Sequence, residues 1–83
     1  MKYYDAALFI PGDKTVAETS AIMERLNDLE VCLDFTTLVF RDDALYFEVG
    51  YPETVSVEQL EGTGAKLDLE TRSDWDVKGA DSQ

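Results

Sequence analysis

The chain has 83 residues, of which 45% are hydrophobic, and its 18 acidic against seven basic residues give a net charge of −11. A chain of this length forms one domain around one core, and its apolar content excludes wholesale disorder. It has no histidine and one cysteine, Cys32. These counts exclude an internal disulfide, thiol–imidazole catalysis and a zinc site of the usual ligands. The start of the chain lacks a signal-peptide pattern and no apolar run could span a membrane, so we expect a cytoplasmic protein without membrane contact.

The first two elements are a strand and a helix. Residues 3–10 are apolar at nearly every position, which is typical of a central strand, and Pro11 ends the run. Thr15 followed by Glu18 forms a capping-box pattern and predicts the start of a helix that ends near Leu29 or Glu30. The apolar stripe expected along this helix consists of Val16, Thr19, Ile22, Met23, Leu26 and Leu29.

Residues 31–51 predict a β-hairpin, because apolar and polar residues alternate on both sides of residues 41–43. Residues directly opposed in an antiparallel pair share a face, so Val39 can oppose Leu45 or Phe47 but not Tyr46. That register excludes a two-residue turn and predicts a loop of three residues, with Asp43 in the left-handed conformation. Leu38, Phe40 and Tyr46 then lie on the face opposite the buried set. Cys32 is expected on that face too, as a small filler.

A second helix and a last strand follow. Pro52 closes the strand before it, Ser56 and Gln59 form a second capping box, and Gly62 and Gly64 end a helix of barely two turns. Residues 66–71 alternate as an edge strand with Leu67 and Leu69 inward. Residues 1–77 are expected to form the domain and residues 78–83 a flexible tail. No internal repeat is expected.

The element order predicts an α+β domain of the small ferredoxin-like βαββαβ type, an antiparallel sheet with both helices on one face. Its first and third strands are expected in the centre. The alternative, given the short second helix, is βαββ with an irregular acidic C-terminal region.

The sequence offers little for catalysis. It lacks a phosphate-binding glycine motif, and its paired carboxylates (residues 42–43, and 74 with 76) have no calcium-loop spacing. We therefore expect no cofactor, no metal ion and no enzymatic activity.

Binding through the acidic surface is the favoured hypothesis. No basic residue lies between Arg41 and Lys66. The carboxylates of this stretch are Asp42, Asp43, Glu48, Glu53, Glu58 and Glu61, and Leu38, Phe40 and Tyr46 are the expected apolar anchors beside them. Such a surface repels nucleic acid and attracts a basic nucleic-acid-binding protein or complex. In size, charge and lack of catalytic residues the chain resembles small phage inhibitors that mimic nucleic acid and block restriction enzymes, glycosylases or CRISPR effector complexes, which act in the host cytoplasm.

Two alternatives stay open. The first is a structural or assembly module, or an immunity or antitoxin-type protein, that forms a homodimer through an open sheet face. The second is adaptation to high salt, in which acidity serves only solubility.

Overall fold

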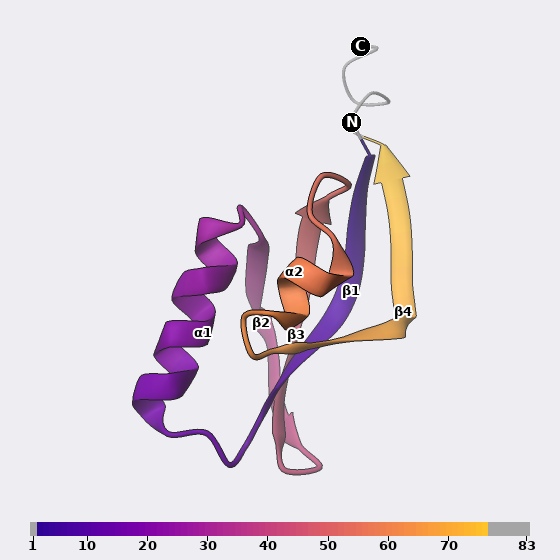
Figure 1. The fold of residues 1–83 in the computed structure, drawn as a ribbon. Helices are drawn as coiled ribbons and strands as arrows, with labels where there is room; N and C mark the ends of the chain where they lie inside the picture. Colours follow the sequence, from indigo (N-terminus) through magenta and orange to yellow (C-terminus); the bar gives the residue numbers. More distant parts are fainter. Residues whose placement is uncertain (1, 77–83) are drawn as a thin grey trace.

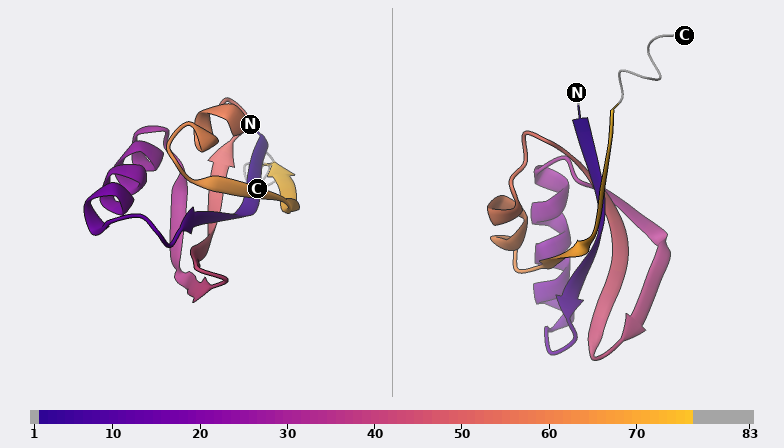
Figure 2. Two further views of the ribbon diagram at one scale, coloured as in Figure 1. Left: turned by 60° about the horizontal axis from the view of Figure 1, so that its bottom comes forward. Right: turned by 90° about the vertical axis from the view of Figure 1, so that its right-hand side faces the viewer.

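The computed structural model describes residues 2–76, for Trp75 and Asp76 in their backbone alone. The elements are β1 (Lys2–Pro11), α1 (Val16–Asp28), β2 (Cys32–Arg41), β3 (Ala44–Pro52), α2 (Val57–Glu61) and β4 (Lys66–Asp76). The strands form one antiparallel sheet in the order β2-β3-β1-β4. Both helices lie on the same side of this sheet (Figures 1 and 2).

This arrangement is α+β and compatible with the ferredoxin-like plan, as the sequence predicts. β3 lies between β1 and β2, and β1 lies between β3 and β4, so each strand–helix–strand unit is split by a strand of the other. The apolar run of residues 3–10 is therefore in the centre of the sheet. The ordered β4 excludes the irregular C-terminal alternative, while the expected flexible tail and Val77 lie outside the described residues.

The core lies between the sheet and its helices. The inward residues of the two central strands alternate with outward ones, and both helices bury a short face on them. Both predicted capping boxes form, so the amides of the N-cap residue and of the third helical residue are satisfied in each helix. The largest fully buried side chains are Leu8, Ile10, Leu26, Phe47, Tyr51 and Leu60.

One residue of the apolar stripe predicted along the first helix is not buried. Val16 is 85% exposed, whereas Ile22 and Leu26 in the second half of α1 are buried. In Figure 1 α1 begins at the end of the molecule that holds the turn between β2 and β3. The spacing of apolar residues identifies the stripe along a helix. How much of that stripe is buried depends on how the helix lies on the sheet.

The predicted three-residue loop is also wrong. Arg41 pairs with Ala44, so Asp42 and Asp43 form a two-residue turn, and both adopt positive φ, 53° and 57°. This is the conformation of a type I′ hairpin turn, which asparagine and aspartate tolerate better than other non-glycine residues. The Asp43 carbonyl accepts a hydrogen bond of 2.6 Å from the Gly12 amide, which ties the turn to the end of β1.

A bulge in β2 explains the altered register. Residues 35–38 of β2 lie opposite the single residue Phe47 of β3, three residues more than regular pairing needs. An odd number of additional residues exchanges the two faces of a strand. Val39 consequently pairs with Tyr46, and Phe40 pairs with Leu45 on the helix side. The prediction that Phe40 shares the open face with Tyr46 is therefore wrong, and Leu38 lies among the unpaired residues of the bulge.

The bulge is held by an aspartate and a threonine. The carbonyl of Asp34 accepts from the hydroxyl of Thr37 at 2.7 Å, and the carboxylate of Asp34 accepts from the amide of Thr36 at 3.1 Å. The same hydroxyl accepts from the amide of Glu48 in β3 at 2.8 Å. The threonine thus replaces the backbone acceptor that the bulge removes from the ladder.

The other edge strand carries the same bulge. Asp68 and Thr71 of β4 repeat the contacts at 2.7 Å (hydroxyl to carbonyl) and 3.2 Å (amide of Glu70 to carboxylate), and the amide of Ala7 donates to Thr71 at 2.7 Å. Here residues 69–72 lie opposite Ala6. Leu69 falls inside this bulge and is 53% exposed, which contradicts its predicted inward position.

The two halves of the chain are therefore similar, which the sequence reading missed. Each half has a proline four residues before a capping box, and later a Leu-Asp pair that begins the bulge. The paired positions are Pro11 and Pro52, Thr15 and Ser56, Asp34 and Asp68, and Thr37 and Thr71. The match is hidden because α1 spans 13 residues and α2 only five.

Candidate binding face

The candidate site is the face of the sheet that carries no helix (Figure 2). Residues that oppose one another across the strands share this face, so the register lays them out in rows. One row contains Asp68, Ala7, Glu48 and Asp34, from β4, β1, β3 and β2 in turn. Asp5 follows in the next row. Four carboxylates from four strands therefore lie on one side of the sheet.

The aromatic part of this face lies nearer the hairpin turn. The rings of Phe9 and Tyr46 are stacked with their centroids 5.2 Å apart, and the guanidinium of Arg41 lies 4.7 Å from the centroid of Tyr46. Val39 is the neighbour of Tyr46 in β2. An apolar surface next to carboxylates is the composition that protein interfaces use for anchors and their charged surroundings.

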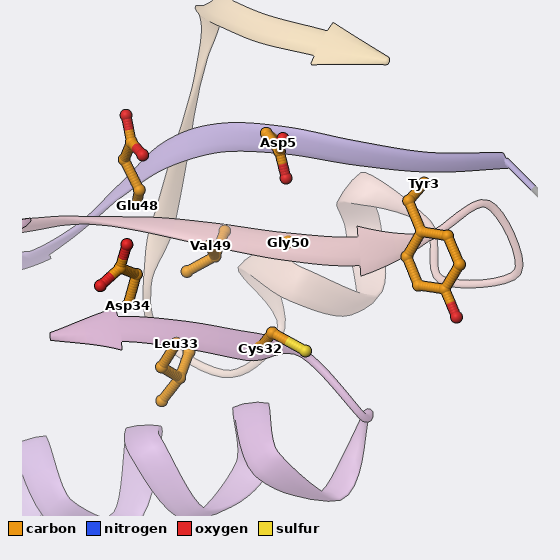
Figure 3. A pocket seen from close by; sticks show the side chains of 8 residues that line it. All are labelled: Tyr3, Asp5, Cys32, Leu33, Asp34, Glu48, Val49 and Gly50. Atoms are coloured by element: carbon orange, nitrogen blue, oxygen red, sulfur yellow. The ribbon is translucent and has the colours of Figure 1, made fainter. Parts of the chain in front are cut away.

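A hollow of about 430 Å³ occupies the other part of the face. Gly50, near the end of β3, lines its floor, and the cross-strand neighbours of Gly50 are Asp5 and Cys32. Figure 3 shows Glu48 and Asp34 at one end of the hollow and Tyr3 at the other. None of the eight residues that line it is basic, so three carboxylates surround the space without a lining cation.

Gly50 is needed to place one of these carboxylates. A Cβ at this position would lie 3.2 Å from the Oδ1 of Asp5 and 4.0 Å from the Cβ of Cys32. The Asp5 carboxylate therefore leans across β3 into the space that a side chain would occupy. A larger residue at position 50 would move this carboxylate and fill the hollow.

The similarity of the two halves shows how the hollow arises. Counted back from Pro11 and Pro52, Phe9 corresponds to Gly50 and Asp5 corresponds to Tyr46. One half of the face thus carries a stacked aromatic pair, and the equivalent place in the other half carries a glycine and a carboxylate. The hollow is a local departure from an otherwise shared plan.

The structure separates the carboxylates that the sequence analysis grouped. Glu48 lies on the open face, whereas Asp42 and Asp43 form the hairpin turn at one end of the molecule (Figure 1). Glu53 follows β3 at the opposite end, and its amide donates to the carbonyl of Lys2 at 2.9 Å. Glu58 and Glu61 belong to α2 on the helix side, where a Glu61 oxygen accepts from the amide of Leu67 at 3.3 Å. These six residues do not form one surface.

Sequence reasoning missed Asp5, Asp34 and Asp68 as companions of Glu48. Alternation along residues 3–10 contained part of the signal, because Tyr3, Asp5, Ala7 and Phe9 share a parity. Bringing Asp34 and Asp68 into the same row depends on the register between strands, which is not contained in any single strand.

Other kinds of site find little support within the described residues. In residues 2–76, no group of three or more potential metal-ligating side chains is arranged to hold a metal ion. In that same part of the chain, no helix has the length and apolar character needed to cross a membrane. The thiol of Cys32 is free and exposed on the open face, as its parity predicts.

Comparisons with protein-family models, with curated proteins and with solved structures find no match to this chain.

Proposed function

We propose that this domain is a non-enzymatic inhibitor that binds a basic, nucleic-acid-binding surface of another protein through the open face of its sheet. The observation that carries the proposal is the gathering of Asp5, Asp34, Glu48 and Asp68 on that face, beside the aromatic pair. Lysine and arginine side chains that hold phosphates are attracted to such an arrangement. The domain thereby competes with nucleic acid, as phage anti-restriction and anti-CRISPR proteins that mimic nucleic acid do.

The docking face differs from the one expected from the sequence. Glu48 and Tyr46 remain members of it, while the hairpin turn, Glu53 and the α2 carboxylates point to other sides of the molecule. The strand edges are poor docking places, because both carry bulges that interrupt regular pairing. The helix-free face is therefore the surface on which charge and aromatic area coincide.

Charge reversal with a matched control tests this proposal. Asp5→Lys with Glu48→Lys changes the open face, while Asp34 and Asp68 are kept because they hold the bulges. Glu24→Lys with Asp28→Lys makes the same change in net charge on exposed positions of α1.

The assay uses a partner captured from the source cell or its host on the immobilised domain, with a labelled duplex to measure the partner's nucleic-acid binding. We expect the wild-type domain to displace the duplex and the open-face variant to do so about tenfold less well. The α1 variant is expected to match the wild type. If both variants displaced the duplex equally poorly, only net charge would matter. If the wild-type domain left the duplex bound to the partner, the proposed inhibition would be refuted.

The alternative of a homodimer through the open face is disfavoured by the same carboxylates. Two copies docked face to face would bring eight acidic side chains of Asp5, Asp34, Glu48 and Asp68 together, and like charges at an interface oppose association. Light scattering distinguishes the two functions. A stable dimer that Tyr46→Glu dissociates would favour the assembly module.

A further inference from the structure

The hollow beside Gly50 has the shape and charge to accept one side chain of the partner. It is open to solvent on the docking face, and its wall combines three carboxylates with the ring of Tyr3 (Figure 3). We propose that it receives an arginine of the bound partner. This inference rests on the proposed function, since it names the chemistry by which the open face recognises its target.

Arginine suits the hollow better than lysine for two reasons. Its planar guanidinium presents five donors and binds carboxylates in pairs, and Asp5, Asp34 and Glu48 approach the hollow from three strands. A guanidinium also stacks on aromatic rings, whereas an ammonium is a compact and strongly hydrated charge.

The same face already shows how a guanidinium lies on it. Arg41 rests 4.7 Å from the ring centroid of Tyr46 in the aromatic half. In the half with the hollow, Tyr3 supplies a ring and Asp5 a carboxylate, but the eight lining residues include no arginine or lysine. A partner's arginine would bring a cation to the three carboxylates that line the hollow, Asp5, Asp34 and Glu48.

The experiment compares the binding of octa-arginine and octa-lysine to the full chain by calorimetry. Three versions of the protein are used: wild type, Gly50→Val and Cys32→Phe. Both variants fill the hollow without changing the net charge, Gly50→Val from β3 and Cys32→Phe from β2. If one of them does not fold, the other still tests the site. Thr54→Val, an exposed position in the loop before α2, is the matched control.

We expect octa-arginine to bind the wild type and Thr54→Val about three- to tenfold more tightly than octa-lysine. In Gly50→Val or Cys32→Phe, if the variant is folded, the ratio of the two affinities should fall towards one. A ratio that is the same in wild type and both filled variants would overturn the arginine site. If the ratio were unchanged but the Asp5→Lys, Glu48→Lys protein no longer bound either peptide, the arginine site would be wrong and the proposed function would stand. Binding of both peptides that ignores this reversal would instead count against the open face itself.

Discussion

The two threonines of the edge bulges provide the sharpest test of the fold. In Thr37→Val and Thr71→Val, a methyl group replaces the hydroxyl at nearly constant volume. Each substitution removes the donor to an aspartate carbonyl, at 2.7 Å in both cases, and the acceptor of a central-strand amide, at 2.8 Å for Glu48 and 2.7 Å for Ala7.

The expected loss in free energy of unfolding is about 1–2 kcal/mol for each variant, because an amide without a partner costs about 1–3 kcal/mol and water can partly reach these edges. For a domain of this size the melting temperature would fall by about 4–8 °C per kcal/mol. Urea titration followed by circular dichroism measures the change.

Two controls separate the hydroxyl from the side-chain shape. Thr37→Ser keeps the hydroxyl and should retain most of the stability. Thr36→Val removes a hydroxyl that donates only to the Asp34 carboxylate, so its effect should stay within about 0.5 kcal/mol. If both bulge variants were as stable as Thr36→Val, the threonines would not hold the bulges in the way described.

Three further predictions follow from particular contacts. Replacing the hairpin turn by Asn-Gly (Asp42→Asn, Asp43→Gly) should stabilise the domain by about 0.5–1 kcal/mol in urea titrations, because both positions have positive φ. The backbone and side-chain hydrogen bonds of Thr15 hold the pKa of Glu18 below its ordinary value, so this contribution to stability is present above the unfolded pKa and lost as pH falls through the folded one. In NMR titrations, Thr15→Ala should raise the pKa of Glu18 only part of the way to its ordinary value, because alanine keeps the backbone amide and loses the hydroxyl. An unchanged pKa would show that the Thr15 hydroxyl has no part in lowering it. Phe40→Ser should leave partner binding intact in calorimetry while Tyr46→Ser weakens it, because only Tyr46 lies on the open face.

Local patterns in the sequence were sufficient for the order and type of the elements. Both capping boxes, the central position of residues 3–10 and the glycine that ends α2 follow from interactions within a few residues of one another. The face of a strand is also local information while the alternation is regular. This is why Tyr46 and Cys32 were placed correctly.

The bulges mark where this reasoning fails. Asp34 and Thr37 form hydrogen bonds that shift the strand by an odd number of residues, so every assignment beyond them is reversed. The candidate face was missed for a related reason. Asp5, Gly50 and Cys32 are far apart in the chain and become neighbours only through the register of β1, β3 and β2.

The proposed function requires the helix-free side of the sheet to bind a basic protein surface. The most direct measurement is the change in amide chemical shifts of the isotope-labelled domain when octa-arginine is added at low salt. We expect the largest changes at Asp5, Asp34, Glu48 and Gly50, and we expect these changes to disappear at high salt. Changes that are largest in α1 and α2, or that salt does not alter, would contradict the proposed function.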